Sequence, residues 1–232
     1  MLKKRGSIPT FIHENMKNYL SMKRKTIMKK LIFVAFAGLL LASCQREGED
    51  TIVLPLPDGK IPYSVISEDL QDSLINNGFV INEGITPPNI EGVYLAAPLL
   101  LHYASDRYTN NFYDLTMTFK NQMQRGMITY SERQRDTVEG ASISAQVIGH
   151  DSCFTMYCYQ YLANYSGATR LWNCKIATVV SGIITSVGIR NCQYSYIMLE
   201  KEAISDYYLS QLAEDETFRI YKDGDNLATK IR

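Results

Sequence analysis

Apolar and polar residues alternate along several short segments of the sequence. Within residues 113–122, every second residue from Leu115 to Phe119 is apolar, and residues 141–147 and 154–162 show the same pattern. Alternation with a period of two places the apolar side chains on one face of a half-buried strand. Further strands are predicted at residues 93–103, 127–133, 170–180, 183–189, 193–200 and 218–222. Short strands separated by glycine-containing turns predict a mainly β fold, either an antiparallel barrel or a sandwich.

A helix is predicted over residues 67–78, before the first strand. Ser67 can cap its first turn, and the acidic residues that follow suit the positive end of the helix dipole. Leu70 and Leu74 lie on one face of this helix, so we expect it to pack on the strands or to plug them. A second short helix is predicted near residues 205–213.

The order of residues 28–43 is that of a secretory signal peptide. Two lysines are followed by an apolar run over residues 31–41 and then by small residues before Cys44. The run is shorter than the roughly 20 residues that a transmembrane helix needs, although a transmembrane or buried helix is the alternative interpretation. Residues 1–27 are basic and delay this signal, which predicts either a start codon assigned too early or a long basic leader.

The stretch of residues 41–44 (LASC) resembles a bacterial lipobox. The resemblance implies cleavage before Cys44 and acylation of that cysteine, which would hold the protein at a membrane. Residues 44–62 are expected to form the lipid anchor and a flexible tether, followed by one β domain over residues 63–232. The acidic cluster after Cys44 resembles the surface-export signal of Bacteroidota-type lipoproteins, so we expect the outer membrane, with the domain facing the cell surface or the periplasm.

The charge of the chain changes when the predicted leader is set aside. Without residues 1–43, the sequence holds 15 basic and 23 acidic residues and carries a net charge of −8. An acidic surface repels phosphate backbones, so no nucleic-acid partner is predicted. The membrane, reached through the N-terminal lipid, is the partner that the sequence indicates first.

Three parts of the chain resemble segments of uncharacterised Bacteroidota-type lipoproteins. They are residues 81–94 (INEGITPPNIEGVY), residues 181–185 with 188–191, and residues 218–225. Gly92 and Tyr94 also resemble the Gly-x-Trp opening of lipocalin-like (calycin) barrels, with tyrosine in the place of tryptophan. The resemblance implies an eight-stranded barrel that can enclose a cavity, and a fold of this kind does not fix a function.

Four cysteines follow Cys44 in the sequence, which permits two disulfides in an oxidising compartment. Cys153 and Cys158 are separated by an odd number of positions, so on one unbroken strand they point to opposite faces. Cys174 and Cys192 lie in neighbouring predicted strands, and we predict a disulfide between them. Four buried free thiols are the alternative interpretation, because cysteine packs well as a small apolar residue.

Few residues of the predicted mature chain suit catalysis. The histidines that follow Cys44 are His102 and His150. Residues 150–153 (HDSC) include a base, an acid and two nucleophiles, but sequence neighbours cannot reach the geometry of a triad, and no Gly-x-Ser-x-Gly motif accompanies them. A Cys-x4-Cys pair with one histidine is one ligand short of a tetrahedral zinc site. We predict no catalytic residue, no metal site and no cofactor.

Aromatic residues are the best sign of a binding surface. The candidates for a ligand or partner face are Tyr157, Tyr159, Tyr161, Trp172, Tyr194 and Tyr196. Exposed tyrosines on one strand face suit stacking on sugar rings or docking on protein. The alternative is that these rings line a barrel interior or support cross-strand pairs.

Together these features predict a lipid-anchored, non-enzymatic binding module for a glycan or an apolar small molecule. The first alternative is an accessory subunit that docks a membrane protein complex through the aromatic face. A hydrolase is the third hypothesis, and it would need His102 or His150 close to an acid and a nucleophile.

Overall fold

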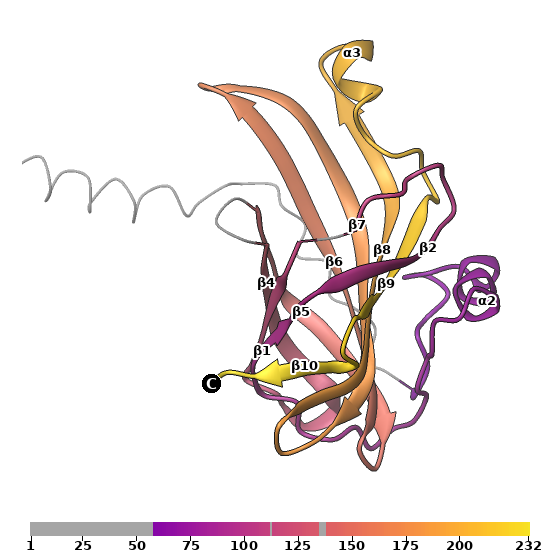
Figure 1. Cartoon of the computed structure of the whole chain (residues 1–232). Helices are drawn as coiled ribbons and strands as arrows, with labels where there is room; N and C mark the ends of the chain where they lie inside the picture. Colours follow the sequence, from indigo (N-terminus) through magenta and orange to yellow (C-terminus); the bar gives the residue numbers. More distant parts are fainter. Residues whose placement is uncertain (1–57, 112, 135–137) are drawn as a thin grey trace, which may run out of the picture. The chain divides into compact units, whose positions relative to one another are not determined.

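The computed structural model describes residues 58–111, 113–134 and 138–232 of the chain (Figure 1). The strands are β1 (Gly92–Ala96), β2 (Leu99–Ala104), β3 (Leu115–Lys120), β4 (Met127–Gln134), β5 (Val138–His150), β6 (Cys153–Ser166), β7 (Thr169–Ile184), β8 (Gly188–Ala203), β9 (Phe218–Asp223) and β10 (Leu227–Lys230). The helices are α2 (Glu68–Asn76), α3 (Asp206–Leu209) and a short 3-10 turn, η1 (Gln124–Gly126). The predicted start region, signal peptide, Cys44 and most of the predicted tether lie outside the described residues.

All of the described strands belong to one antiparallel sheet, which confirms the predicted fold class. The strand order is β10-β1-β3-β4-β5-β6-β7-β8-β9-β2, and β10 pairs with β8 as well as with β1. The additional pairing joins Leu227 to Arg190 and Thr229 to Gly188. The sheet is therefore partly closed into a ring, and β9 and β2 continue it beside β8. No helix in the described part of the chain is long and apolar enough to cross a membrane.

The strand boundaries differ from the predicted ones at three places. Residues 93–103 form two strands, because Pro98 lies between β1 and β2 and has no N–H to donate to the sheet. Residues 183–189 are not a separate strand: β7 continues through Ile184, and the turn to β8 follows it. Strand β10 was not predicted, because it is short and Ala228 is its one buried residue.

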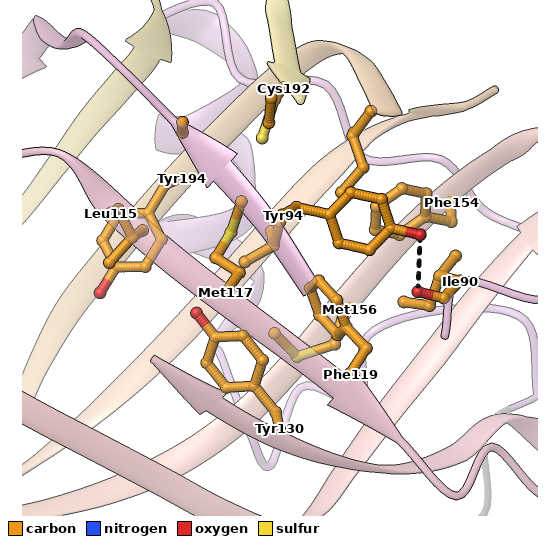
Figure 2. Packing of buried hydrophobic residues seen from close by; sticks show 14 of the residues in the cluster. Ile90, Tyr94, Leu115, Met117, Phe119, Tyr130, Phe154, Met156, Cys192 and Tyr194 are labelled. Atoms are coloured by element: carbon orange, nitrogen blue, oxygen red, sulfur yellow. Dashed lines mark hydrogen bonds between the residues drawn. The ribbon is translucent and has the colours of Figure 1, made fainter. Parts of the chain in front are cut away.

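Large aromatic and aliphatic side chains fill the inside of the ring (Figure 2). We call this cluster the inner core. Its largest members are Tyr94, Phe119, Tyr130, Phe154, Tyr194 and Tyr221. The centroid of the Phe119 ring lies 5.8 Å from that of Tyr94 and 5.2 Å from that of Tyr130, within the range of favourable aromatic contacts. The Tyr94 hydroxyl donates to the Ile90 carbonyl at 3.2 Å, which satisfies its polar atom inside the core.

The N-terminal part of the described chain covers the outer face of the sheet. Ile61, Leu74 and Phe79 pack there against side chains of β6 to β9, and we call this cluster the outer core. Gln71 of α2 donates from its amide to the carbonyls of Ile61 and Ile66, at 3.0 and 2.7 Å. The predicted helix therefore packs on the outside of the sheet, and the packed core begins at Ile61, just before the predicted domain start at residue 63.

The predicted disulfide between Cys174 and Cys192 is wrong. Cys174 pairs with Lys201 near the end of β8, whereas Cys192 lies near the start of that strand. At roughly 3.3 Å per residue, the two positions are about 30 Å apart along β8. Both thiols are free and buried, and burial raises the pKa of Cys174 to about 11 and that of Cys192 further. The alternative of free thiols holds for Cys153, Cys158, Cys174 and Cys192.

The contacts of α2 predict that alanine substitutions at Leu74 and at Ile75 change the free energy of unfolding by different amounts. Leu74 has no exposed surface, whereas the Ile75 side chain is 51 % exposed. We expect Leu74→Ala to lower the free energy of unfolding by about 2–5 kcal/mol, because it leaves a cavity in the outer core. The control Ile75→Ala should change it by about 0.5 kcal/mol or less. Urea denaturation of both variants checks this, and equal losses would show that α2 does not pack as described.

Candidate functional site

The predicted aromatic face is divided between two sides of the sheet. Tyr157 is fully buried in the outer core, and the Tyr159 hydroxyl donates to the Ser64 carbonyl at 2.9 Å. Tyr194 and Tyr196 point to the opposite side, into the ring. Of the tyrosines on β6 predicted to form the row, Tyr161 is the one that stays exposed. The side chains thus do not form one continuous aromatic surface, and the alternative of rings that line the interior holds for Tyr194 and Tyr196.

Trp172 lies in a separate apolar cluster at one end of the sheet. Strand β5 pairs with β6 only up to Tyr157, so the later part of β6 has β7 as its one partner. Strands β6, β7 and β8 extend past the ring towards α3 (Figure 1). The inner face of this extension carries Leu162, Trp172, Cys174, Ile176 and Met198, which we call the apolar wall.

A carboxylate is buried between the inner core and the apolar wall. Glu132 of β4 accepts hydrogen bonds from the hydroxyls of Tyr130, at 2.6 Å, and Tyr194, at 3.1 Å. The Gln160 amide also faces this carboxylate, without a hydrogen bond of ordinary length to a described residue. Gln160 is opposite Ile176 of the wall, and Thr178 is opposite Cys158. We call Tyr130, Glu132, Gln160, Thr178 and Tyr194 the polar layer.

Burial controls the protonation of the polar layer. It raises the pKa of the Glu132 carboxyl, whereas the hydrogen bonds from the two tyrosines and the nearby Gln160 amide lower it. Burial and the neighbouring carboxylate raise the pKa values of Tyr130 and Tyr194 well above the usual value. Both hydroxyls are therefore hydrogen-bond donors at neutral pH. The layer can accept or donate hydrogen bonds to a polar group, but it holds no activated nucleophile.

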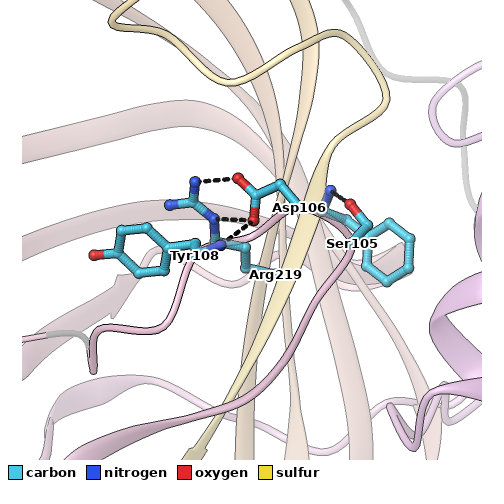
Figure 3. Close-up of polar contacts among 5 residues, drawn as sticks. Ser105, Asp106, Tyr108 and Arg219 are labelled. Carbon is cyan, nitrogen blue, oxygen red and sulfur yellow. Dashed lines mark hydrogen bonds and ion pairs between the residues drawn. The ribbon is translucent and has the colours of Figure 1, made fainter.

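A second polar cluster joins Arg219 of β9 to Asp106 and Tyr108 (Figure 3). Arg219 of β9 is opposite Tyr196 and therefore shares the inner face. Its guanidinium lies 3.6 Å from the centre of the Tyr108 ring, and its Nε donates to Asp106 Oδ1 at 3.2 Å. The hydrogen bond from Arg219 lowers the pKa of Asp106. Ser105 fixes the same loop by accepting a hydrogen bond from the Phe218 N–H at 3.0 Å.

The histidines do not form a catalytic arrangement within the described residues. His150 Nδ1 lies 3.2 Å from Asp151 Oδ2, and both side chains are exposed. His102 is beside Lys222 and Gly78, where burial and then the Lys222 charge lower its pKa. In residues 58–111, 113–134 and 138–232, no three His, Cys, Asp or Glu side chains gather as a metal site would require.

Comparison with known proteins does not place the chain in a family: no family model, no curated protein and no solved structure matches it. The protein is therefore classified by its fold, as an antiparallel β protein whose sheet is partly closed into a ring.

Of the polar layer, Tyr194 alone was among the predicted site residues, and the Arg219 cluster was not predicted from the sequence. Residues 127–133 were predicted as a strand, and Glu132 falls on the same face as Ile128 and Tyr130 in that alternation. An acidic residue on the apolar face of a strand is the signal that could have identified it. Arg219 gave no such signal, because Asp106 and Tyr108 reach it from a distant loop.

The raised pKa of Glu132 predicts a pH dependence of folding. The folded state keeps the carboxyl proton to a higher pH than the unfolded state, whose pKa is near 4.5. The stabilisation by the neutral carboxyl is therefore complete below about pH 4.5 and is lost as the pH rises through the folded-state pKa. Glu132→Gln stays neutral, so its free energy of unfolding should rise relative to the wild type over that interval.

Urea denaturation between pH 4 and pH 8 would measure this difference. The exposed Glu200→Gln is the matched control, because the same charge is removed where solvent screens it. Its pH dependence should follow the wild type. A Glu132→Gln variant with the wild-type pH dependence would contradict the burial of an ionisable carboxyl in the ring.

Proposed function

We propose that the protein is a non-enzymatic binding module for an apolar or amphipathic small molecule. The observation that carries the proposal is the juxtaposition, on one inner face, of the apolar wall and the polar layer. A ligand on this face would place its apolar part against Trp172 and Met198. Its polar end would reach the hydrogen-bonding groups near Glu132 and Gln160. Binding sites for small molecules commonly combine an apolar lining with a few polar groups that fix the orientation.

The arrangement of the tyrosines favours an apolar ligand over a glycan. A glycan platform needs several exposed rings on one surface. Tyr157 is buried under the N-terminal segment, and Tyr159 is held by its hydrogen bond to Ser64. The partly buried side chains of Leu162 and Trp172, by contrast, present apolar surface on the inner face. Each 100 Å² of apolar surface that a ligand covers there would contribute about 2.5 kcal/mol before the costs of association.

A second candidate function is docking of a membrane protein partner. Tyr161 and Tyr165 of β6 are 60 % and 44 % exposed, and Tyr207 of α3 is 68 % exposed. Exposed aromatic side chains are enriched in protein interfaces. The accessory-subunit hypothesis would use these tyrosines, at the ends of the extended strands, in place of the predicted continuous aromatic face.

We also propose that this module lies at the outer membrane, anchored by acyl chains on Cys44. The support is the order of residues 28–44, in which a basic start, an apolar run and a lipobox-like stretch follow one another. More than one acyl chain makes such an anchor stable, because one chain alone binds a bilayer only reversibly.

The single tryptophan of the sequence provides a direct test of ligand binding. Trp172 is part of the apolar wall, so a ligand bound there should shift its emission to shorter wavelength in a saturable manner. Titration of the purified protein with dodecanoate, followed by intrinsic fluorescence, measures this. No change with dodecanoate or with longer acyl chains would overturn the proposal and favour the docking function.

Two neighbouring positions on β6 provide matched variants. Leu162 belongs to the apolar wall, whereas Ala163 is exposed and lies on the opposite face. Leu162→Glu should weaken dodecanoate binding by about tenfold or more, because it places a charge beside the ligand. Ala163→Glu adds the same charge outside the site and should leave the affinity unchanged. Equal losses would indicate binding elsewhere.

The anchor has its own test. Cys44→Ala should abolish incorporation of labelled palmitate in the native host and move the protein from the membrane fraction to the soluble fraction. The control Cys153→Ala removes a cysteine that no lipobox-like stretch precedes, and it should leave labelling unchanged. Labelling that persists in Cys44→Ala would show that the anchor is not at this cysteine.

A further inference from the structure

A separate pocket of about 300 Å³ lies at the other end of β6 and β7, away from the apolar wall. The N-terminal segment forms one side of it with Val80 and Asn82, and Ile183 and Lys222 contribute from the sheet. Its volume is at the lower end of the range for small-molecule sites. The pocket shares no residue with the apolar wall or the polar layer.

The pocket is built by partly buried hydrogen bonds between the N-terminal segment and the strands. Gln193 Oε1 accepts from the Val80 N–H at 2.7 Å, and Gln193 Nε2 donates to the Gly78 carbonyl at 2.8 Å. Asn82 donates to the Phe154 carbonyl and to Ser181 Oγ, each at 3.0 Å. These contacts hold the N-terminal segment at a fixed distance from the strands, so the shape of the pocket is set before a ligand arrives.

Among the described residues, Lys222 is the one charged side chain that lines this pocket. It is partly buried and makes no ion pair or hydrogen bond with another described residue. The side-chain nitrogens of Lys222 and His102 both lie close to Gly78, at one edge of the pocket. A Cβ placed on Gly78 would be 3.7 Å from Lys222 Nζ and 2.9 Å from His102 Nε2. Burial and then the Lys222 charge lower the pKa of His102, so the positive charge at this edge is that of Lys222. The electrostatics at this edge therefore favour an anion.

The remaining free polar groups of the pocket are carboxamides. The Asn191 and Asn226 side chains line it, and neither forms a hydrogen bond with another described residue. Each can both donate to and accept from a hydroxyl group. Val80 and Ile183 supply an apolar surface, and no carboxylate of the described part of the chain lines the pocket.

We propose that this pocket binds a small polyhydroxylated carboxylate, the chemistry of a uronic acid residue. The carboxylate would pair with the Lys222 ammonium, and ring hydroxyls would bond to Asn191 and Asn226. The C–H face of the sugar would lie against Val80 and Ile183. The ligand class follows from one unpaired cation, two unpaired amides and a volume that admits a single ring.

The test uses the purified protein with glucuronate, glucose and inorganic phosphate as probes, measured by isothermal titration calorimetry. Glucuronate should bind about tenfold more tightly than glucose, because its hydrogen bond to Lys222 is charge-assisted, and the affinity should fall as salt is raised. Lys222→Gln should remove this preference, and Lys222→Arg should retain most of it. The control Lys120→Gln changes an exposed lysine of β3 that does not line the pocket and should have no effect.

Cys153 provides a second measurement at the site itself. It lines the pocket and is partly accessible, so alkylation by iodoacetamide, located by peptide mass spectrometry, should slow when the pocket is filled. Glucuronate should protect Cys153 in the wild type and not in Lys222→Gln. A cooperative thermal unfolding transition of each protein should show that both are folded. Equal affinity for glucose and glucuronate, or unchanged protection in Lys222→Gln, would overturn the proposal. Phosphate that binds as tightly as glucuronate would overturn the sugar assignment.

Discussion

Strand β8 divides its backbone hydrogen bonds among different partners along its length, and the rest of the structure depends on this division. Its first residues pair with β10, and the segment from Gln193 to Ile197 pairs with β9. Beyond that segment, β7 is its one strand partner. The ring is consequently closed where β10 joins it and widens where β6, β7 and β8 continue alone (Figure 1). The dry inner core lies at the closed part, and the apolar wall lies on the extension.

The central strands are covered on both faces, which explains why the predicted aromatic surface is not there. Met156 and Val180 face the inner core, while Tyr157 and Val179 face the outer core. A strand that is buried on both sides needs a second layer over it, and the N-terminal segment with α2 supplies that layer. The same segment creates the small pocket beside Gln193, because its path is fixed by hydrogen bonds where it leaves the outer core.

The sequence predicted those elements whose pattern is local and failed where distant contacts decide. The alternation from Leu115 to Phe119 identified β3 because one face of that strand is buried and the other is not. The helix at α2 was found from its acidic first turn and leucine spacing, although Ser67 makes no capping hydrogen bond with its side chain. The disulfide could not be judged, since it depends on the register of β7 against β8 and on bulges within it. The contact of Arg219 with Asp106 is equally non-local.

The position of Glu132 is the strongest reason to regard the wide part of the ring as a functional region. Burying a carboxyl costs free energy, and a barrel that needed only a stable core would place an apolar side chain there. Two tyrosine hydroxyls offset part of that cost, and the Gln160 amide beside them has no hydrogen bond of ordinary length to a residue that the structure describes. An incompletely satisfied polar group between an apolar core and an apolar wall is a costly arrangement for folding alone. A ligand whose polar end reaches this layer would complete its hydrogen bonds while its apolar part covers the wall.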